Sequence, residues 1–146
     1  MTIDDSFEVD APLDRVWALL KDVPRVATCI PNAEITEVVD EKTYRAKIAV
    51  KVGPVSVSYR ATIVVDSIDD ETHTATLRVQ GDEMRGRGGV KASVVSRATA
   101  RDGKTHVDLH TDAQISGIIA TVGGRLIEGV AKRTIAEFAA NLAKLV

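Results

Sequence analysis

The feature that most constrains the fold is a change in the period of the apolar residues along the chain. From about residue 35 to residue 115, apolar and polar side chains alternate, as in β-strands with one buried face. From residue 126 to residue 145, apolar positions recur every three or four residues, as on one face of a helix about 30 Å long. Because the sheet must cover its apolar face, the pattern predicts an α+β fold in which a curved antiparallel sheet packs around a long C-terminal helix.

Turn and cap residues divide the chain into elements. We expect a first strand from Ile3 to Val9, a helix over residues 13–20 with Asp10 as its N-cap, and a second short helix that begins near Pro24. The C-terminal helix is expected to be capped by Thr121. Hairpin signals separate six further strands, expected over residues 35–39, 44–52, 55–65, 75–79, 90–100 and 107–115. The prediction is therefore a seven-stranded antiparallel sheet with two short helices after its first strand.

Length and charge narrow the class of protein. The chain has 146 residues and a formal net charge of −2, so we expect one domain over residues 1–146 and no dedicated nucleic-acid binder. One cysteine excludes an internal disulfide framework. No apolar run reaches the length of a membrane span, and no signal-peptide pattern opens the chain. The expected location is the cytoplasm.

The composition raises a question about the core. Only five residues are aromatic, whereas valine and alanine together account for 38 residues. Aromatic side chains fill volume well, so this composition fits either a compact core of small residues or an internal cavity. For the second interpretation, the residues expected to line a ligand cavity between sheet and helix are Tyr59, Ile63, Leu77, Val79, Leu109, Ala113, Leu126 and Val130.

Two groups of chemically versatile side chains are interpreted as structural. His106, Asp108, His110 and Asp112 share one face of a strand. The two histidines stand about 13 Å apart on an extended strand, too far to share a metal ion. Because the alternate residues are apolar, we expect this face to be solvated and to bind no metal. The lone cysteine, Cys29, lies among apolar residues and is expected to be a packed, inert thiol.

Two further segments allow a functional interpretation beside a structural one. The glycine-rich segment 81–89 is either a flexible hairpin connection or a mobile flap that presents Met84, Arg85 and Arg87. The last helix carries cations off its apolar stripe, at Arg125, Lys132 and Arg133. These side chains form either a solvated face of the helix or a contact with a membrane or a partner. No catalytic constellation emerges, and the sequence predicts no catalytic residues.

Three segments are similar to a known family. They are residues 7–12 followed by the Trp17 helix (residues 16–22), the Cys29-Ile30-Pro31-Asn32 segment, and the Gly123-Gly124-Arg125 start of the last helix. Together they resemble the CoxG family of carbon monoxide dehydrogenase subunits, within the SRPBCC or START-like helix-grip superfamily. Family members usually carry glycine where this chain has Asn32, and asparagine tolerates the same left-handed backbone. Longer members continue into a linker and a hydrophobic tail.

The resemblance implies a helix-grip domain with a hydrophobic cavity and no enzymatic activity of its own. It implies an accessory role beside a CO dehydrogenase-type molybdenum hydroxylase and a link between that enzyme and the inner face of the cell membrane. No covalently bound cofactor is implied. A hydrophobic electron acceptor, a quinone such as menaquinone, is the expected ligand, since its aliphatic tail needs a long apolar pocket. Two alternatives stay open: a membrane-docking or assembly protein that binds no ligand, and a generic binder of lipid-like small molecules.

Overall fold

The computed structural model describes residues 1–146. The strands are β1 (Thr2–Val9), β2 (Ala33–Val38), β3 (Thr43–Val52), β4 (Val55–Asp69), β5 (Thr74–Glu83), β6 (Gly89–Arg101) and β7 (Lys104–Ile115). The helices are α1 (Leu13–Leu20), α2 (Val23–Ala27), the 3-10 helix η1 (Ile119–Val122) and α3 (Gly124–Ala143). The element order follows the period change in the sequence, with both short helices directly after the first strand.

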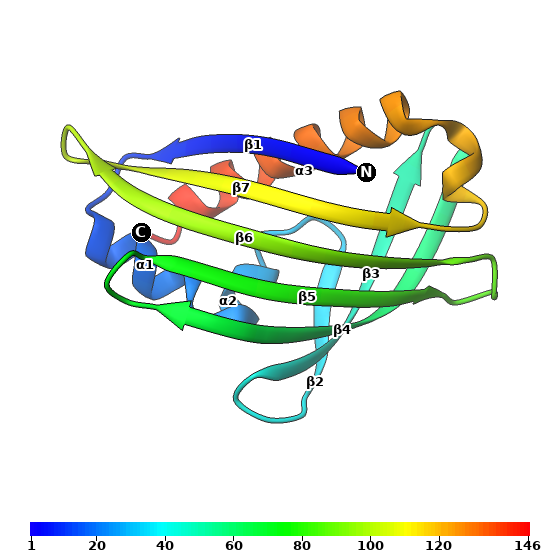
Figure 1. Ribbon diagram of the computed structural model, residues 1–146, viewed down its shortest axis with the longest axis horizontal. Helices are drawn as coiled ribbons and strands as arrows, with labels where there is room; N and C mark the ends of the chain where they lie inside the picture. The colour runs from blue at the N-terminus through cyan, green and yellow to red at the C-terminus, as the bar shows by residue number, and fades with distance from the viewer.

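All seven strands form one antiparallel sheet in the order β1-β7-β6-β5-β4-β3-β2. The sheet curves around α3, which lies on its concave side (Figure 1). The backbone of α3 comes close to β1, at one edge of the sheet, and to β3, near the other edge. The helix therefore bridges the two flanks of the sheet, and the predicted helix-grip architecture is confirmed.

Local sequence signals predicted the correct elements but not every cap. Asn32 adopts the left-handed conformation expected of it, with φ 61°. The N-cap of α1 is Pro12 and no side chain caps it, so the prediction for Asp10 is wrong. Thr121 does not cap α3 either, because its hydroxyl donates to the carbonyl of Ile118 within η1. The N-cap of α3 is Gly123 with φ 96°, a backbone conformation that is cheap only for glycine.

The strand register decides which side chains face the helix. Val107 of β7 is fully buried and pairs with Ala98 of β6, which is 1% exposed, so both point to the inner, concave face. Because side chains alternate along a strand, every second residue from these two positions is also an inner one. The pairing of β6 with β5, and of β5 with β4, carries the same inner rows across the sheet.

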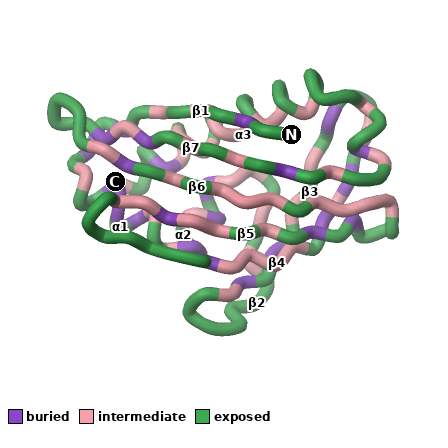
Figure 2. Tube along the Cα trace, in the orientation of Figure 1, coloured by how far each residue is buried: buried purple, intermediate pink, exposed green.

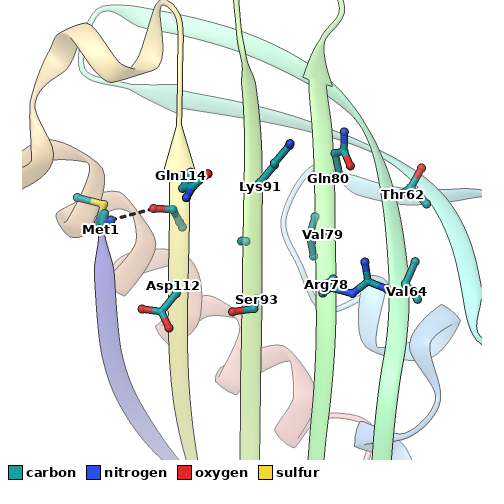
Figure 3. Close-up of a pocket in the computed structure, with 12 residues that line it drawn as sticks. Met1, Thr62, Val64, Arg78, Val79, Gln80, Lys91, Ser93, Asp112 and Gln114 are labelled. Atoms are coloured by element: carbon teal, nitrogen blue, oxygen red, sulfur yellow. Dashed lines mark hydrogen bonds between the residues drawn. The ribbon is translucent and has the colours of Figure 1, made fainter.

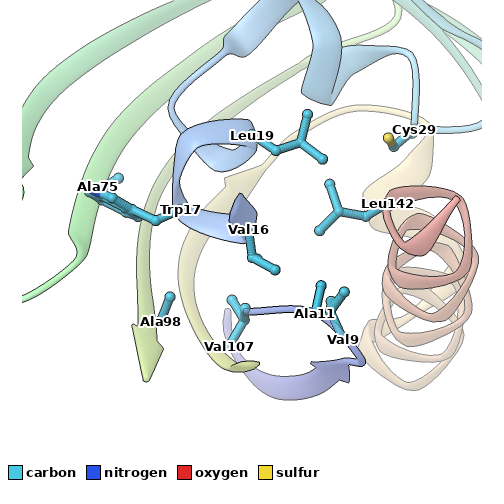
Figure 4. Close-up of a cluster of buried hydrophobic side chains, with 10 residues drawn as sticks. All are labelled: Val9, Ala11, Val16, Trp17, Leu19, Cys29, Ala75, Ala98, Val107 and Leu142. Atoms are coloured by element: carbon cyan, nitrogen blue, oxygen red, sulfur yellow. The ribbon is translucent and has the colours of Figure 1, made fainter. Parts of the chain in front are cut away.

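The packed core occupies the two ends of the molecule more than its middle (Figure 2). The largest cluster joins the C-terminal end of α3 to α1 and to one end of the sheet, and Leu142 points into it from α3 (Figure 4). A second cluster joins the β3–β4 hairpin to η1 through Val52, Val57, Tyr59 and Ile119. A smaller third cluster packs α2 on β3 and β4. Two packed ends therefore hold α3 over the sheet.

The glycine-rich segment 81–89 is a hairpin connection, the first of its two interpretations. Residues 81–83 extend β5, residue 89 begins β6, and the turn between them joins two paired strands. The carboxylate of Glu83, whose side chain is 1% exposed, accepts hydrogen bonds from the Arg87 guanidinium and from the backbone N–H groups of Ser58, Arg85 and Arg87. An ionised carboxylate with this many donors fixes a loop strongly. The interpretation as a hairpin connection is confirmed, and these hydrogen bonds argue against the mobile flap.

The backbone itself also ties this hairpin down. Gly88 lies against the carbonyl of Ser116, and Gly117 lies against the carbonyl of Arg87, so closely that a Cβ atom at either glycine would collide with the opposing backbone. The N–H of Ile118 donates to the Arg87 carbonyl at 2.8 Å. The segment has four glycines in nine residues. At Gly88 the reason is that two backbone segments approach so closely that a side chain would not fit between them.

The ionisation of Glu83 makes part of the stability dependent on pH. The Arg87 guanidinium lowers the pKa of Glu83 from 4.5 to about 2. Because the unfolded chain takes up the proton first, this stabilisation is present above about pH 4.5 and is lost as the pH falls toward about 2. We expect the free energy of unfolding, measured with urea, to fall over this range less in Glu83→Gln than in the natural chain. A direct NMR titration that gave Glu83 an ordinary pKa would contradict this.

Candidate ligand site

The candidate site is the space between the inner face of the sheet and α3. In a filled core, the inner residues of both elements would be buried. Along α3 only Leu142 is buried, and every other residue of the helix keeps some contact with solvent space. On the sheet, the central inner residues are only half-buried although they are mostly apolar: Ile63, Leu77, Val79, Ala92, Val94, Leu109 and Thr111. The middle of the grip is therefore not filled by side chains.

The total surface leads to the same conclusion. A monomer of 15.7 kDa exposes about 7,300 Å² by the usual scaling of surface with mass. This chain exposes 8278 Å², and only 24 of its 146 residues are buried. The excess, about 1,000 Å² against that scaling, is consistent with inner walls that water can reach. This favours the cavity over the compact core of small residues.

An apolar hollow of about 390 Å³ opens where the start of β1, the end of β7, η1 and the start of α3 meet. Its walls are Met1, Ala113, Gln114, Ile115, Ala120 and Ile127. The Met1 ammonium donates to the Ala113 carbonyl at 2.8 Å and holds the beginning of β1 at this rim. Two of the hollow's residues, Ile115 and Ile127, also pack against the Tyr59 cluster, so the hollow adjoins one packed end.

The structure brings most of the eight predicted lining residues to one surface. Ile63 pairs with Val79 and Val65 pairs with Leu77 across β4 and β5, all on the inner face. Leu109 and Ala113 lie on the inner face of β7, Tyr59 on that of β4, and Val130 packs toward the Tyr59 cluster from α3. Leu126 differs, since its side chain is 47% exposed and lies over Gly53 in the β3–β4 turn.

Sequence reasoning missed several inner residues next to the predicted ones, among them Ala92, Val94 and Ile127. Ala92 lies between Val79 and Ala113 in the same cross-strand row, and Val94 lies between Leu77 and Thr111. Ile127 takes the inward position on α3 beside the outward Leu126. Strand β6 alternates less cleanly than its neighbours in the sequence, so only the register identifies its inner side chains.

The two inner tyrosines differ in one respect. The Tyr44 hydroxyl donates to the backbone carbonyl of Glu41 at 2.9 Å. The hydroxyl of Tyr59, a residue 6% exposed, has no hydrogen-bond partner in the protein. Burial and the neighbouring Glu83 carboxylate raise the pKa of Tyr59 above its ordinary value, so at neutral pH it keeps its proton. Because the hydroxyl oxygen is not fully enclosed by the protein, it faces solvent space and is free to donate to a ligand beside the apolar walls.

A second hollow, of about 510 Å³, lies on the opposite, convex face of the sheet (Figure 3). Its exposed side chains are polar and come from two cross-strand rows, such as Gln80 with Lys91 and Arg78 with Ser93. Arg78 is already paired with Asp66 at 2.8 Å. Inner residues such as Val79 contribute only backbone here, because their side chains point to the other face. The walls of this hollow therefore combine charged and polar groups with apolar atoms, among them those of Val64, in contrast to the largely apolar inner face.

The histidines predicted to lie on the solvated face do lie on the outer side of β7, in separate pairs. His110 is hydrogen-bonded to Asp4 of β1 and to Asp112, which raises its pKa. His106 lies near Asp108 at 3.1 Å and is more buried than expected, with its side chain 13% exposed. No three of the histidine, cysteine, aspartate and glutamate side chains gather as a metal site. The contact of His110 with Asp4, and that of His106 with Glu8 at 3.7 Å, join β7 to β1.

The predicted packed thiol is confirmed in its placement. Cys29 is 1% exposed and belongs to the cluster around Leu142. Its sulfur lies 3.8 Å from the Arg25 carbonyl, and the Asn141 amide donates to the Cys29 carbonyl at 3.0 Å. The segment therefore anchors the end of α3. The cationic residues Arg125, Lys132 and Arg133 of α3 are exposed or half-exposed along the helix.

Comparison with solved structures places this fold in the START-like helix-grip class. A conserved protein from Geobacillus kaustophilus is similar with a TM-score of 0.87 and 28% identity, over 99% of this chain and 93% of that one. The Zhui aromatase/cyclase from Streptomyces sp. R1128 (TM-score 0.67, 18% identity, 99% and 92%) and a START superfamily protein from Mycobacterium smegmatis (0.66, 15%, 99% and 96%) share the fold. No curated protein sequence matches this chain.

The sequence family is more specific than the fold class. The CoxG family of carbon monoxide dehydrogenase subunits matches residues 6–146, so the chain belongs to that family. The resemblance in the Trp17 helix, the Cys29 segment and the Gly123-Gly124 helix start is thereby confirmed. None of the helices has the length and apolar character needed to span a membrane.

Two alanines on one strand test whether the middle of the grip is hollow. Ala92 and Ala98 both point inward from β6, but Ala92 is half-buried and Ala98 is 1% exposed in the packed end. We expect Ala92→Phe to leave the free energy of unfolding within about 1 kcal/mol, because the ring enters open space. Ala98→Phe should cost about 1–3 kcal/mol or more through overpacking. Equal destabilisation of the two variants in urea titrations would show a solid interior.

Proposed function

We propose that this protein is a non-catalytic accessory protein of a CO dehydrogenase-type molybdenum hydroxylase. In this proposal it binds a quinone, such as menaquinone, between the sheet and α3, and it links the dehydrogenase to the membrane. The observation that carries the proposal is the half-exposed apolar inner face of the sheet, in a chain of the CoxG family. Buried apolar walls left unfilled by the protein's own side chains are favourable sites for an apolar ligand.

The shape and chemistry of the walls support a quinone within the class of hydrophobic ligands. The central inner row runs through Ala113, Ala92, Val79 and Ile63, and such small side chains leave length for an aliphatic tail. A quinone also carries carbonyl oxygens, which accept hydrogen bonds. The free hydroxyl of Tyr59 supplies a donor at one end of this surface. One donor among apolar residues suits a ligand with a small polar head and a long tail.

The buried carboxylate on the inner face, that of Glu83, is already hydrogen-bonded, which supports a binding role rather than a catalytic one. Glu83 is the buried carboxylate of the sheet, and its oxygens already accept hydrogen bonds from Arg87 and from three backbone N–H groups. Its pKa of about 2 makes it a weak base near neutral pH. A general base must be able to reach the ligand and take a proton from it. The Glu83 carboxylate instead accepts hydrogen bonds that hold the β5–β6 hairpin closed.

The unpaired tyrosine gives a test of the ligand class. We expect Tyr59→Phe to weaken binding of a menaquinone about two- to tenfold, the usual worth of one neutral hydrogen bond. The matched variant Tyr44→Phe should bind the quinone normally, because the Tyr44 hydroxyl is engaged with Glu41. Squalene, a hydrocarbon without carbonyl groups, should bind both variants alike. Tryptophan fluorescence quenching or equilibrium dialysis measures these affinities, and equal effects of the two tyrosine variants would contradict this assignment.

The proposal as a whole is decided by what the purified protein carries. Organic extraction after expression in a menaquinone-producing host, followed by mass spectrometry, should recover a quinone in a fixed ratio to the protein. Recovery of fatty acids or phospholipids instead would support the generic lipid binder. Recovery of no ligand, with no quinone binding in titrations, would leave the membrane-docking or assembly protein. Co-purification with the dehydrogenase tests the partner separately.

A further inference from the structure

One end of the molecule combines exposed apolar side chains with unpaired cations. The β3–β4 hairpin, the β5–β6 hairpin and the corner between η1 and α3 lie at this end, on the right in Figure 1. Their exposed large apolar side chains are Leu126 at 47% and Met84 at 41%. Lys51, Arg85 and Arg125 are exposed there and form no salt bridge. We call these five side chains, with the Gly53–Pro54 turn, the basic end.

The residues of the basic end form one continuous surface. Lys51, Met84 and Arg85 line a common hollow between the two hairpins. On the other side of the β3–β4 hairpin, Leu126 lies over the turn at Gly53, and Arg125 precedes it in the first turn of α3. The surface thus runs from the β5–β6 hairpin across the turn to the start of α3.

The cations of the basic end have few carboxylates beside them. Glu83 is buried with Arg87, and Glu128 lies 3.4 Å from Lys132 on α3; Asp82, next to Glu83 in β5, is exposed. The opposite end carries exposed charges of both signs, with Asp69 and Glu71 in the β4–β5 turn and Lys104 in the β6–β7 turn. A locally basic surface is attracted to an anionic bilayer.

From this arrangement we infer that the basic end docks on a bilayer that contains anionic phospholipid. Its apolar side chains project from separate hairpin tips rather than from a flat patch, and a deformable lipid interface accommodates such tips while the cations meet phosphate groups. The surface also adjoins the apolar hollow lined by Ala120 and Ile127. If the protein binds a lipid-soluble ligand as proposed above, docking through the basic end places the opening for that ligand next to the membrane.

Vesicle flotation tests the surface. The natural chain should float with phosphatidylcholine vesicles that contain about one third phosphatidylglycerol, and should not float with phosphatidylcholine alone or at high salt. Lys51→Glu and Arg125→Glu should each lower the partition coefficient about fivefold or more, and Leu126→Asp should lower it on anionic vesicles. Lys104→Glu, in the β6–β7 turn at the opposite end, is the matched control and should float normally.

Menaquinone binding in solution, measured on the same variants, separates this inference from the proposed function. Loss of flotation in the basic-end variants with quinone binding retained supports the surface. Failure of the natural chain to float, or equal loss in Lys104→Glu, overturns the surface even if quinone binds. Loss of dehydrogenase co-purification in the basic-end variants, without any vesicle binding by the natural chain, would assign the basic end to a protein partner and would also overturn it. Flotation without quinone binding would sustain the surface while the proposed function fails.

Discussion

The position of α3 over the sheet depends on packing at its two ends. At the C-terminal end, Leu142 is fully buried among residues of α1, β1 and β7. At the N-terminal end, Ile127 and Val130 pack on the cluster around Tyr59 and Ile119. Between these anchors the sheet curves away from the helix, and the facing aliphatic side chains of the sheet stay half-buried. Interior packing is stabilising where side chains interdigitate, so stability is concentrated at the ends and the middle is left for a ligand.

The closed hairpin at Glu83 serves the same arrangement. The Glu83 carboxylate closes the β5–β6 hairpin on itself and ties it to Ser58 of β4. Backbone hydrogen bonds from Ile118 to Arg87 and between Gly89 and Ser116 hold this hairpin against the segment that leads into η1. Two glycines allow the backbones to approach so closely that no other residue fits. The corner that positions η1 and the start of α3 is therefore fixed by backbone hydrogen bonds to a hairpin that charge-assisted hydrogen bonds close. Because this corner is fixed, the residues of η1 and α3 at the rim of the apolar hollow stay in place.

Function in this fold class follows the lining of the space and not the fold itself. Similar structures include an aromatase/cyclase and a START superfamily protein, and at such low identity they share only the architecture. What this chain adds is an aliphatic wall of alanine, valine, leucine and isoleucine, one tyrosine hydroxyl without a protein partner, and a carboxylate whose oxygens are already hydrogen-bonded. Its membership of the CoxG family supplies the biological setting for the proposed quinone carrier.

The sequence by itself determined the elements, because alternation and helical spacing report which side chains must leave water. It also identified the inner positions on β4, β5 and β7, where alternation is regular. It failed at the caps expected from Asp10 and Thr121, because several neighbouring residues can take an N-cap position and the path of the backbone decides which one does. It left open whether the 81–89 segment is a plain hairpin connection or a flap, because that depends on contacts with distant residues such as Ser58 and Ile118.

Only the tertiary structure decided whether the grip is filled. The same count of valines and alanines fits a compact core or an open one, and the difference lies in how far α3 stands from the sheet. Register placed Ala92 and Val94 beside the predicted residues and turned Leu126 outward onto Gly53. Those outcomes follow from long-range packing, which no local pattern encodes, since a side chain's burial depends on which distant element comes to lie over it.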